Sequence, residues 1–404
     1  MDIACPTCLT PFTLKCDISA TQCGHVFHSN CIEKWLQTGK KTCPQCRENC
    51  TIKGTKKLYF SSTGNVKKRD AVQADLSHAQ SEAKRWKSEM AKKDEINKSM
   101  HKWMFKNNPS NEAGSTLLHW AAEHGHLDIC KSIMEEAPDK NPRDKIGCTP
   151  LHEAAEGGYK DICKLIFRSV QDKNPKDDRG STPLHAAVAS GDQEIFKVIF
   201  DQVGDKNPED YTGWTPLHIA GESGNQEIFE TIFQYVLDKN PKDKDGDTPL
   251  HSAAQAGHYS ICKHIINKIE VKNPENAKNL TPLHLAASWG HLGICELILK
   301  NTTEKCPKDN KGWTPLHFSA QDGQVLVHRM FMLMLEDKNP KDNDGYTPFH
   351  AAAENGQIEV CRLIMDVIGD IFPKTKDKIT PLHLAARAGH IEVNDLILSY
   401  ASNC

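Results

Sequence analysis

The sequence lacks a strong net charge. Its 404 residues include 50 lysines and arginines against 53 aspartates and glutamates, which gives a formal charge of −3. A protein that holds nucleic acid mainly through the phosphates needs a concentrated positive field. The near balance therefore does not favour nucleic acid as a partner, and the interspersed Lys and Glu residues are typical of solvated faces.

Long apolar runs are also missing. No stretch of 18 consecutive apolar residues occurs, and no basic segment followed by an apolar one stands at the N-terminus. A membrane-spanning helix needs about 20 mostly apolar residues, and a secretory leader needs such a basic and apolar pair. We therefore expect no membrane partner and an intracellular protein, cytoplasmic by default. Nuclear entry stays open, because Lys56, Lys57 and the basic residues 67–69 resemble a two-part import signal.

Cysteine and histidine, by contrast, are concentrated at the N-terminus. Two Cys-x-x-Cys pairs each put two thiolates on a short turn, and Cys-x-His and His-x-x-Cys segments lie between them. The eight residues are Cys5, Cys8, Cys23, His25, His28, Cys31, Cys43 and Cys46. They fill two tetrahedral Zn²⁺ sites with none left over. Closed sites leave no position for water, so we expect structural zinc and no catalytic residue at the metal.

The order and spacing of these ligands resemble the RING finger with two histidines. That resemblance implies a cross-brace domain over residues 1–50, in which the two sites interleave. One zinc would be held by Cys5, Cys8, His28 and Cys31, and the other by Cys23, His25, Cys43 and Cys46. It further implies binding of a ubiquitin-conjugating enzyme charged with ubiquitin, and transfer to a substrate lysine without a covalent intermediate on this chain.

The same resemblance implies four residues that contact the conjugating enzyme. Active members present a hydrophobe between the first two ligands, a tryptophan beyond the sixth and a proline after the seventh. Trp35 and Pro44 match, whereas Thr7 stands where isoleucine or valine is common. Arg47 follows the last ligand, where many active members bridge the enzyme to ubiquitin, and its planar fork of donors suits that role. Because Thr7 departs, a non-catalytic, zinc-stabilised scaffold or adaptor stays open as an alternative.

A repeat of 33 residues dominates the rest of the chain. A Thr-Pro-Leu-His tetrapeptide or close variant recurs nine times, and a glycine follows each histidine by six residues. The histidines are His119, His152, His185, His218, His251, His284, His317, His350 and His383. This motif and period are the signature of ankyrin repeats, each a β-turn followed by two antiparallel helices. We predict a mostly α protein, with nine repeats over 113–404 forming an α-solenoid and a half-repeat cap over 96–112.

The intervening segment is predicted to contain a linker at 51–69 and a helix at 70–95. Apolar residues in that helix recur at spacings of four and three, as in a short coiled coil. They are Val72, Leu76, Ala79, Ala83, Trp86 and Met90. Two alanines weaken this seam, so a homodimer and an independent or array-docked helix are equal alternatives.

Residues 1–95 also resemble the TRAF-interacting protein family. The resemblance rests on three motifs: Cys23-Gly24-His25-x-Phe27-His28, Cys43-Pro44-Gln45-Cys46-Arg47 and Lys57-Leu58-Tyr59-Phe60. The ankyrin array departs from that family, so its substrates and nuclear roles do not carry over.

Five of the ten remaining cysteines and the repeat histidines have structural interpretations. Five cysteines lie eleven residues after a repeat histidine, where Phe196 and Phe229 occupy the same phase. They are Cys130, Cys163, Cys262, Cys295 and Cys361. We expect buried free thiols, as in a reducing compartment. No nucleophile recurs beside the repeat histidines, so we expect these to hold the turns by hydrogen bonds.

Ankyrin arrays as a family bind proteins through turn tips and first helices. Aromatic residues at positions that the repeat leaves free are candidates for substrate binding, because aromatic side chains are enriched in interface cores. They are Tyr211, Trp214, Trp289, Trp313 and Tyr346. The alternative is that each covers its neighbouring repeat. Together the two modules predict a RING-type ubiquitin ligase whose array holds a protein substrate; a nucleic-acid-binding regulator would rest only on the basic linker clusters.

Overall fold

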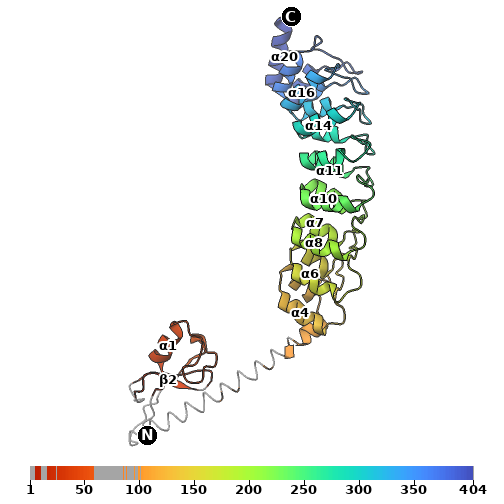
Figure 1. Cartoon of the computed structure of the whole chain (residues 1–404). Coiled ribbons are helices and arrows are strands. Elements are labelled where there is room, and N and C mark those ends of the chain that lie inside the picture. The colour runs from red at the N-terminus through yellow and green to blue at the C-terminus, as the bar shows by residue number, and fades with distance from the viewer. Residues whose placement is uncertain are drawn as a thin grey trace, which may run out of the picture. The chain divides into compact units, whose positions relative to one another are not determined.

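The computed structural model describes residues 5–10, 16–23, 25–58, 99–100 and 102–403, together with residues 85, 88 and 95. The chain divides into two compact units, Met1–Asn107 and Asn108–Cys404. Figure 1 shows the first as a small mixed domain and the second as stacked helix pairs. Within the described residues, no helix is long and apolar enough to cross a membrane.

Three short antiparallel strands form the framework of the first unit. β1 (Ile18–Ala20) lies between β2 (Val26–His28) and β3 (Lys56–Leu58), and α1 (Ser29–Gln37) follows β2 directly. The short 3₁₀ turn η1 (Ile52–Gly54) leads into β3. Because β3 pairs with β1, the sheet extends through Leu58. Three residues of the predicted 51–69 linker thus take part in this sheet, and the predicted domain boundary at residue 50 stays a prediction.

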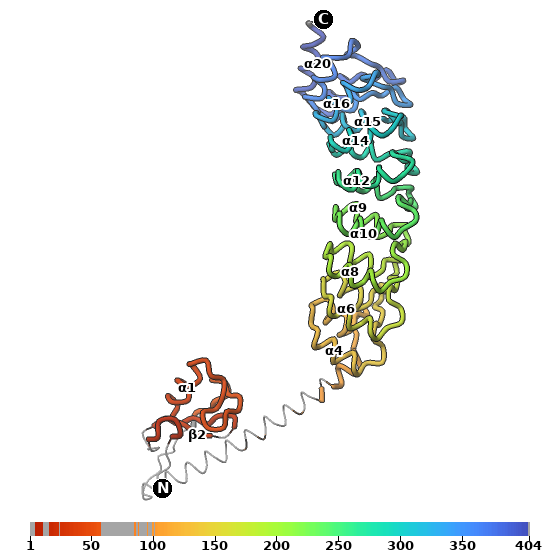
Figure 2. The backbone as a smooth tube through the Cα atoms, in the orientation of Figure 1, coloured from red at the N-terminus to blue at the C-terminus, as the bar shows by residue number. Residues whose placement is uncertain are grey.

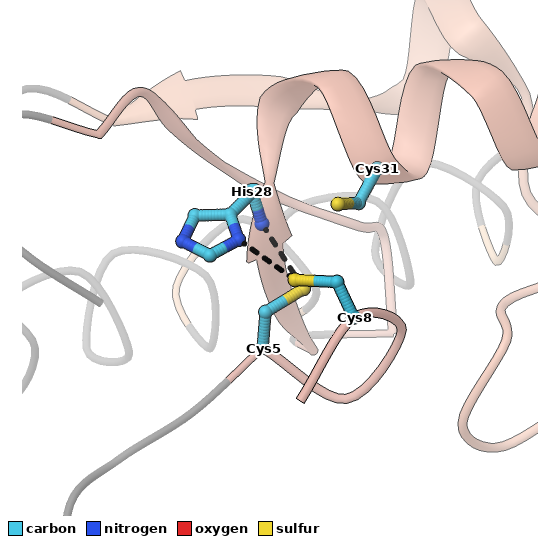
Figure 3. A group of neighbouring side chains, drawn as sticks. All are labelled: Cys5, Cys8, His28 and Cys31. Carbon is cyan, nitrogen blue, oxygen red and sulfur yellow. Dashed lines mark hydrogen bonds between the residues drawn. The ribbon is translucent and has the colours of Figure 1, made fainter. Parts of the chain in front are cut away.

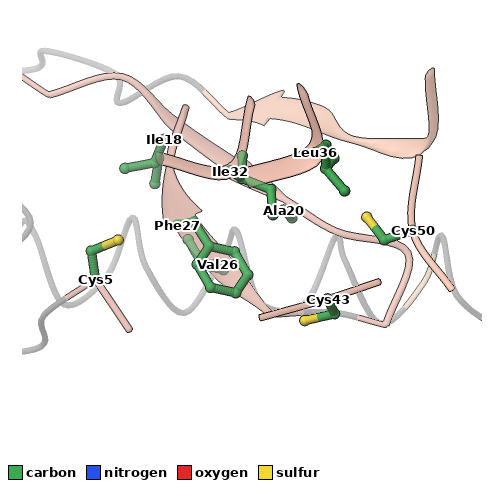
Figure 4. Packing of buried hydrophobic residues seen from close by; sticks show 9 residues of the cluster. All are labelled: Cys5, Ile18, Ala20, Val26, Phe27, Ile32, Leu36, Cys43 and Cys50. Atoms are coloured by element: carbon green, nitrogen blue, oxygen red, sulfur yellow. The ribbon is translucent and has the colours of Figure 1, made fainter. Parts of the chain in front are cut away.

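The core of this domain is small and includes zinc ligands. The buried cluster consists of Cys5, Ile18, Ala20, Val26, Phe27, Ile32, Leu36, Cys43 and Cys50 (Figure 4). Ile32 and Leu36 lie one helical turn apart on α1 and face the sheet. Cys5 and Cys43 belong to different predicted zinc sites, yet both have no exposed surface. A core of this size gives only marginal stability by itself. Metal ligation therefore has to supply much of the folding free energy of this domain.

Each repeat contributes one first helix and one second helix, and like helices pack on like helices of the next repeat (Figures 1 and 2). The first helices are α3 (Leu117–Glu123), α5 (Pro150–Glu156), α7 (Pro183–Ser190), α9 (Pro216–Ser223), α11 (Pro249–Ala256), α13 (Pro282–Ser288), α15 (Pro315–Gln321), α17 (Pro348–Glu354) and α19 (Pro381–Ala388). The second helices are α4 (Leu127–Glu136), α6 (Lys160–Phe167), α8 (Gln193–Gln202), α10 (Gln226–Tyr235), α12 (Tyr259–Ile266), α14 (Leu292–Asn301), α16 (Val325–Met334), α18 (Ile358–Met365) and α20 (Ile391–Asn403). The predicted helical array is confirmed.

The Thr-Pro-Leu-His motif begins each first helix by a reciprocal cap. In α9 the Thr215 amide donates to Nδ1 of His218 at 3.2 Å, and Thr215 Oγ1 lies 2.9 Å from the same nitrogen. Nε2 of His218 then donates to the Asp247 carbonyl of the next turn at 3.2 Å. Both ring nitrogens are used, and the same cap occurs in the other first helices. The repeat histidines are structural, as predicted.

The connector Asp-Lys-Asn-Pro ties consecutive repeats together. Oδ1 of Asp238 accepts from the Asn240 amide at 3.0 Å, and the Lys239 ammonium donates to the Phe233 carbonyl at the end of α10. Oδ1 of Asn240 accepts from the Leu250 amide in the first turn of α11 at 3.1 Å. One tetrapeptide thus caps the outgoing helix and holds the incoming one.

The same connector bond appears at the start of the array. Oδ1 of Asn108 accepts from the Leu118 amide at 3.0 Å, after helical residues 102–107. Met100 and Trp103 remain 51% and 60% exposed, so neither is fully covered. The cap boundaries at 96–112 stay a prediction. The coiled-coil residues lie outside the described residues: Val72, Leu76, Ala79, Ala83, Trp86 and Met90.

The core of the array repeats with the same period. The five predicted core cysteines, Cys130, Cys163, Cys262, Cys295 and Cys361, have no exposed surface. His328 and Asn394 occupy this phase in the seventh and ninth repeats, and each leaves a buried polar atom without a hydrogen bond, Nε2 and Oδ1 respectively, among the residues described. These two positions are irregular in an otherwise apolar core.

Candidate zinc centres and partner surfaces

The first ligand set gathers where β2 runs into α1. Sγ of Cys8 lies 3.2 Å from Nδ1 of His28, and the His28 amide lies 3.4 Å from Sγ of Cys5. The Cys31 thiol reaches the same space from the first turn of α1 (Figure 3). One ligand atom from each of the four residues falls within 4.8 Å of the others.

The second set joins the β1–β2 turn to the turn that follows residue 42. Nδ1 of His25 lies 3.3 Å from Sγ of Cys23 and 3.8 Å from Sγ of Cys43. Cys46 completes the group, whose four ligand atoms also lie within 4.8 Å of one another. The sequence partners are therefore interleaved, as the family resemblance implied.

Both sets fit tetrahedral zinc. Zn–S bonds of about 2.3 Å and Zn–N bonds of about 2.0 Å place ligand atoms about 3.6 Å apart at tetrahedral angles. The observed sulfur–nitrogen separations of 3.2, 3.3 and 3.8 Å bracket that value. The donor set of six thiols and two imidazoles is the one that structural zinc prefers, which supports two Zn²⁺ ions as the cofactors.

Neighbouring hydroxyl groups and burial shift the pKa values of the ligand thiols. A hydrogen bond from Thr10 lowers the pKa of the Cys8 thiol to about 6, whereas burial raises the pKa of the Cys31 thiol to about 12. Thr21 Oγ1 lies 3.0 Å from Sγ of Cys23 and so reaches the second set. Because Cys31 retains its proton at neutral pH until a metal displaces it, zinc affinity falls as the pH falls.

The two Cys-x-x-Cys turns have the same backbone geometry. The Leu9 amide donates to the Cys5 carbonyl at 2.8 Å, and the Arg47 amide donates to the Cys43 carbonyl at 2.9 Å. Leu9 and Arg47 have φ angles of 59° and 61°, in the left-handed region that few non-glycine residues adopt. Each turn thus projects the side chain of the residue after its second cysteine.

Comparison with known proteins agrees with this geometry. A family model for ankyrin repeats in three copies matches residues 89–177, 169–243, 230–309, 257–339, 302–373 and 328–404, which together span most of the chain. The chain belongs to the ankyrin-repeat family. A second family model, for the Ring finger domain, matches residues 3–47 and covers all eight zinc ligands.

Curated relatives match at the RING finger. The probable E3 ubiquitin-protein ligase XERICO of Arabidopsis thaliana is 44% identical over 46 residues, which are 11% of this chain and 28% of that protein. RING-H2 finger protein ATL18 of the same plant is 47% identical over 47 residues, 11% of this chain and 32% of that protein. E3 ubiquitin-protein ligase RNF103 of Homo sapiens is 49% identical over 43 residues, 11% of this chain and 6% of that protein. The chain spans less than a third of each relative.

The candidate conjugating-enzyme residues of the RING finger differ in exposure. Thr7 and Arg47 are exposed, while Pro44 is half-buried. Trp35 is also half-buried, and its indole Nε1 donates to the Thr42 carbonyl at 2.8 Å. Trp35 therefore both packs on the core and holds the segment that carries the second Cys-x-x-Cys pair.

Sequence reasoning missed Leu9 as a surface residue. Its side chain is 79% exposed on the first Cys-x-x-Cys turn, at the place equivalent to Arg47 on the second. The equivalence of the two turns was available as a signal, because both residues directly follow a Cys-x-x-Cys pair. A single exposed apolar residue is common on soluble proteins, so Leu9 is a candidate for partner contact through this equivalence alone.

The candidate substrate residues of the ankyrin repeats fall into two groups. Trp289 and Tyr211 are 59% and 55% exposed. Trp214, Trp313 and Tyr346 are half-buried: Nε1 of Trp214 donates to Asp243 at 3.0 Å, Nε1 of Trp313 donates to Asp342 at 3.0 Å, and the hydroxyl of Tyr346 donates to Glu354 at 2.6 Å.

The half-buried group packs along the array. The Trp313 and Tyr346 rings stack with centroids 5.7 Å apart, and each also stacks on the histidine of its own repeat. These three residues therefore support neighbouring repeats in addition to any binding role. Trp214 and Trp289 line one surface cavity, so the structure brings these two candidates together.

Proposed function

We propose that this protein is a RING-type ubiquitin ligase. Its RING finger recruits a charged ubiquitin-conjugating enzyme, and its ankyrin array holds the protein substrate. The observation that carries the proposal is the assembly of two complete, interleaved zinc ligand sets beneath exposed Leu9 and Arg47. Two of the relatives described above support it by name, XERICO as a probable E3 ubiquitin-protein ligase and RNF103 as an E3 ubiquitin-protein ligase.

The mechanism requires no nucleophile from this chain. Both metal sites are closed by four protein ligands, so zinc supplies rigidity rather than a reactive water. Leu9, Pro44 and Trp35 would dock the conjugating enzyme, and the Arg47 guanidinium would hydrogen-bond the enzyme and ubiquitin together. Holding the thioester in one reactive orientation converts a mobile pair into a near-attack arrangement.

The alternative function is a non-catalytic scaffold in which the RING finger only docks or dimerises. Thr7 favours it, because an exposed threonine offers less apolar contact than the isoleucine or valine of active members. We also propose that residues 1–95 are related to the TRAF-interacting protein family, with a homodimer through the predicted coiled coil. The buried free thiols support a reducing compartment, and we propose an intracellular location, cytoplasmic or nuclear.

Discharge of ubiquitin from charged conjugating enzymes to free lysine tests the proposal. Zinc-loaded protein is assayed across a panel of conjugating enzymes, with autoubiquitination as a second readout. We expect accelerated discharge with at least one enzyme, and Thr7→Ile should strengthen docking roughly fivefold by adding apolar contact at an exposed site. The scaffold function would be established instead if zinc-loaded, folded protein accelerates ubiquitin discharge from no enzyme of the panel, both as the wild type and as Thr7→Ile.

A further inference from the structure

A cavity on the ankyrin array has the chemistry to hold a cationic side chain. It has a volume of about 420 Å³ and lies across the fourth to sixth repeats. Its lining includes two tryptophans, two carboxylates, a buried histidine and a leucine: Trp214, Trp289, Glu222, Asp247, His251 and Leu285. They come from α9, α11, α13 and the turns before and after these first helices.

One wall of the cavity is rigid. The Trp214 indole donates to Asp243 at 3.0 Å on one edge, and its ring stacks on His218 with centroids 5.8 Å apart. The Trp214 backbone amide is held in turn by Oδ1 of Asp210 at 2.9 Å. An aromatic face fixed in this way binds a ligand without a large loss of side-chain entropy.

The second tryptophan of the lining is exposed. Trp289 ends α13, and its side chain is 59% accessible. Within the described array, no hydrogen bond or ring contact is found for its indole. The ring of Trp313, by contrast, is covered by Tyr346 and Phe318, whose ring centroids lie 5.7 and 5.5 Å from its own. Trp289 therefore offers aromatic surface that the repeats themselves do not use.

Two carboxylates set the sign of the charge. Glu222 is exposed, and the Asp247 side chain keeps 35% of its surface while Oδ1 accepts from Asn276 at 2.8 Å. No lysine or arginine lines the cavity in the described array. His251 does not offset the carboxylates, because burial lowers its pKa and keeps the ring neutral. Indole faces are themselves regions of negative potential.

The first helices of the whole array carry more carboxylates than cations, and Glu222 is the one of these that lines the cavity. Charged residues on the first helices are Glu123, Glu153, Glu156, Glu222, Glu354 and Arg387. The single arginine is paired with Glu354 at 2.7 Å.

We propose that this cavity binds an arginine side chain of the partner protein, presented by a basic extended segment. The proposal rests on the substrate-holding role of the array and specifies its chemistry. A guanidinium can stack on an indole while its donors reach Glu222 and Asp247. Lysine supplies the charge without the planar fork, so it should bind more weakly.

Selection from a bead-displayed random heptapeptide library by zinc-loaded full-length protein tests the proposal. We expect arginine to be enriched at one position. In solution, a selected peptide should lose roughly fivefold or more in affinity when citrulline replaces that arginine, because citrulline keeps the shape and removes the charge that drives cation–π attraction. Lysine at that position should give an intermediate affinity.

Variants assign the binding to the cavity. Trp289→Ala and Asp247→Asn should each weaken the arginine peptide roughly fivefold. Asparagine retains an oxygen that can accept from Asn276, so the fold is preserved, and thermal melting verifies it. Trp120→Ala is the matched control, because Trp120 is an exposed tryptophan of the array outside the cavity, and it should bind peptide at the wild-type level.

Three results would overturn the assignment: no enrichment of arginine, equal affinity of the citrulline peptide, or wild-type affinity in both cavity variants. Ubiquitin discharge is measured on the same preparations. Discharge without arginine binding overturns the cavity alone, whereas arginine binding without discharge overturns the proposed ligase function alone.

Discussion

The two modules are stabilised in opposite ways. The RING finger depends on eight side chains that meet at two points, and one ligand of each site is also part of its small core. The ankyrin array distributes stability over nine similar units, each with its own cap, connector and core positions. Loss of one zinc ligand should therefore destabilise the whole first module, whereas a comparable substitution in the array should destabilise mainly its own repeat and the adjacent ones.

Zinc removal should give the largest contrast between the modules. Structural zinc contributes roughly 10–16 kcal/mol per site, which exceeds what the small RING core can replace. We expect a chelator to unfold the RING finger and leave most of the helical signal of the array. Circular dichroism reports the array, and cysteine accessibility reports the ligands. Cooperative loss of the whole helical signal at the same chelator dose would refute the separation.

Acid should weaken the array through its neutral histidines. Burial lowers the pKa of His284 to about 4 and that of His317 to about 3, both below the ordinary value of 6.5. At pH values between the folded pKa and 6.5, the unfolded chain therefore binds more protons than the folded chain. The free energy of unfolding thus decreases as the pH falls from about 6.5 towards 4. Each unit of pKa separation corresponds to about 1.4 kcal/mol.

Chemical denaturation of the array at pH 7 and pH 5 measures this loss. Several histidines titrate together, so the midpoint should move markedly. A midpoint that stays constant, or rises on acidification, would contradict neutral buried histidines. Zinc is omitted from both samples, so that its release cannot contribute to the difference.

Arg47 should matter to ubiquitin transfer through its side chain rather than its backbone. Its φ of 61° strains alanine but suits glycine. We expect Arg47→Gly to fold and bind zinc normally, yet to slow thioester discharge by roughly 30-fold, which corresponds to about 2 kcal/mol of lost contact. Arg47→Lys should recover only part of the rate. Discharge at the wild-type rate in Arg47→Gly would exclude the bridging role.

A single substitution in the array should produce the smallest effect. His328 is buried, its Nδ1 lies 2.9 Å from the Ser319 hydroxyl, and its Nε2 is unsatisfied among the described residues. His328→Cys restores the residue found in other repeats and should stabilise the array by about 1 kcal/mol. The reverse change, Cys295→His in the neighbouring repeat, should destabilise it. Denaturant midpoints at pH 7.5 compare the two, and opposite signs are required.

Sequence alone predicted the parts of the structure that its patterns specify. Ligand spacing predicted both zinc sets, and the 33-residue period predicted the helix pairs and the caps around residues such as His218. It did not predict β3, because three residues beginning with Lys56 and Lys57 carry no strand periodicity. Half-burial of Trp214 depended on Asp243, a partner in the next repeat that propensity does not reveal. His328 could have been identified, since it stands in the cysteine phase.

The Asp-Lys-Asn-Pro connector has a mechanical consequence. Asn240 bonds the first turn of the next repeat while Lys239 caps the previous helix, so this boundary has short-range bonds of its own. Cys306 and Phe372 replace the asparagine at the boundaries before α15 and α19. A pulling force applied to the two ends of the array would load the hydrogen bonds of the successive repeat boundaries in series. Extension should then proceed one repeat at a time, and each 33-residue unit would release about 115 Å of chain. The array would then behave as a spring that extends in steps of one repeat.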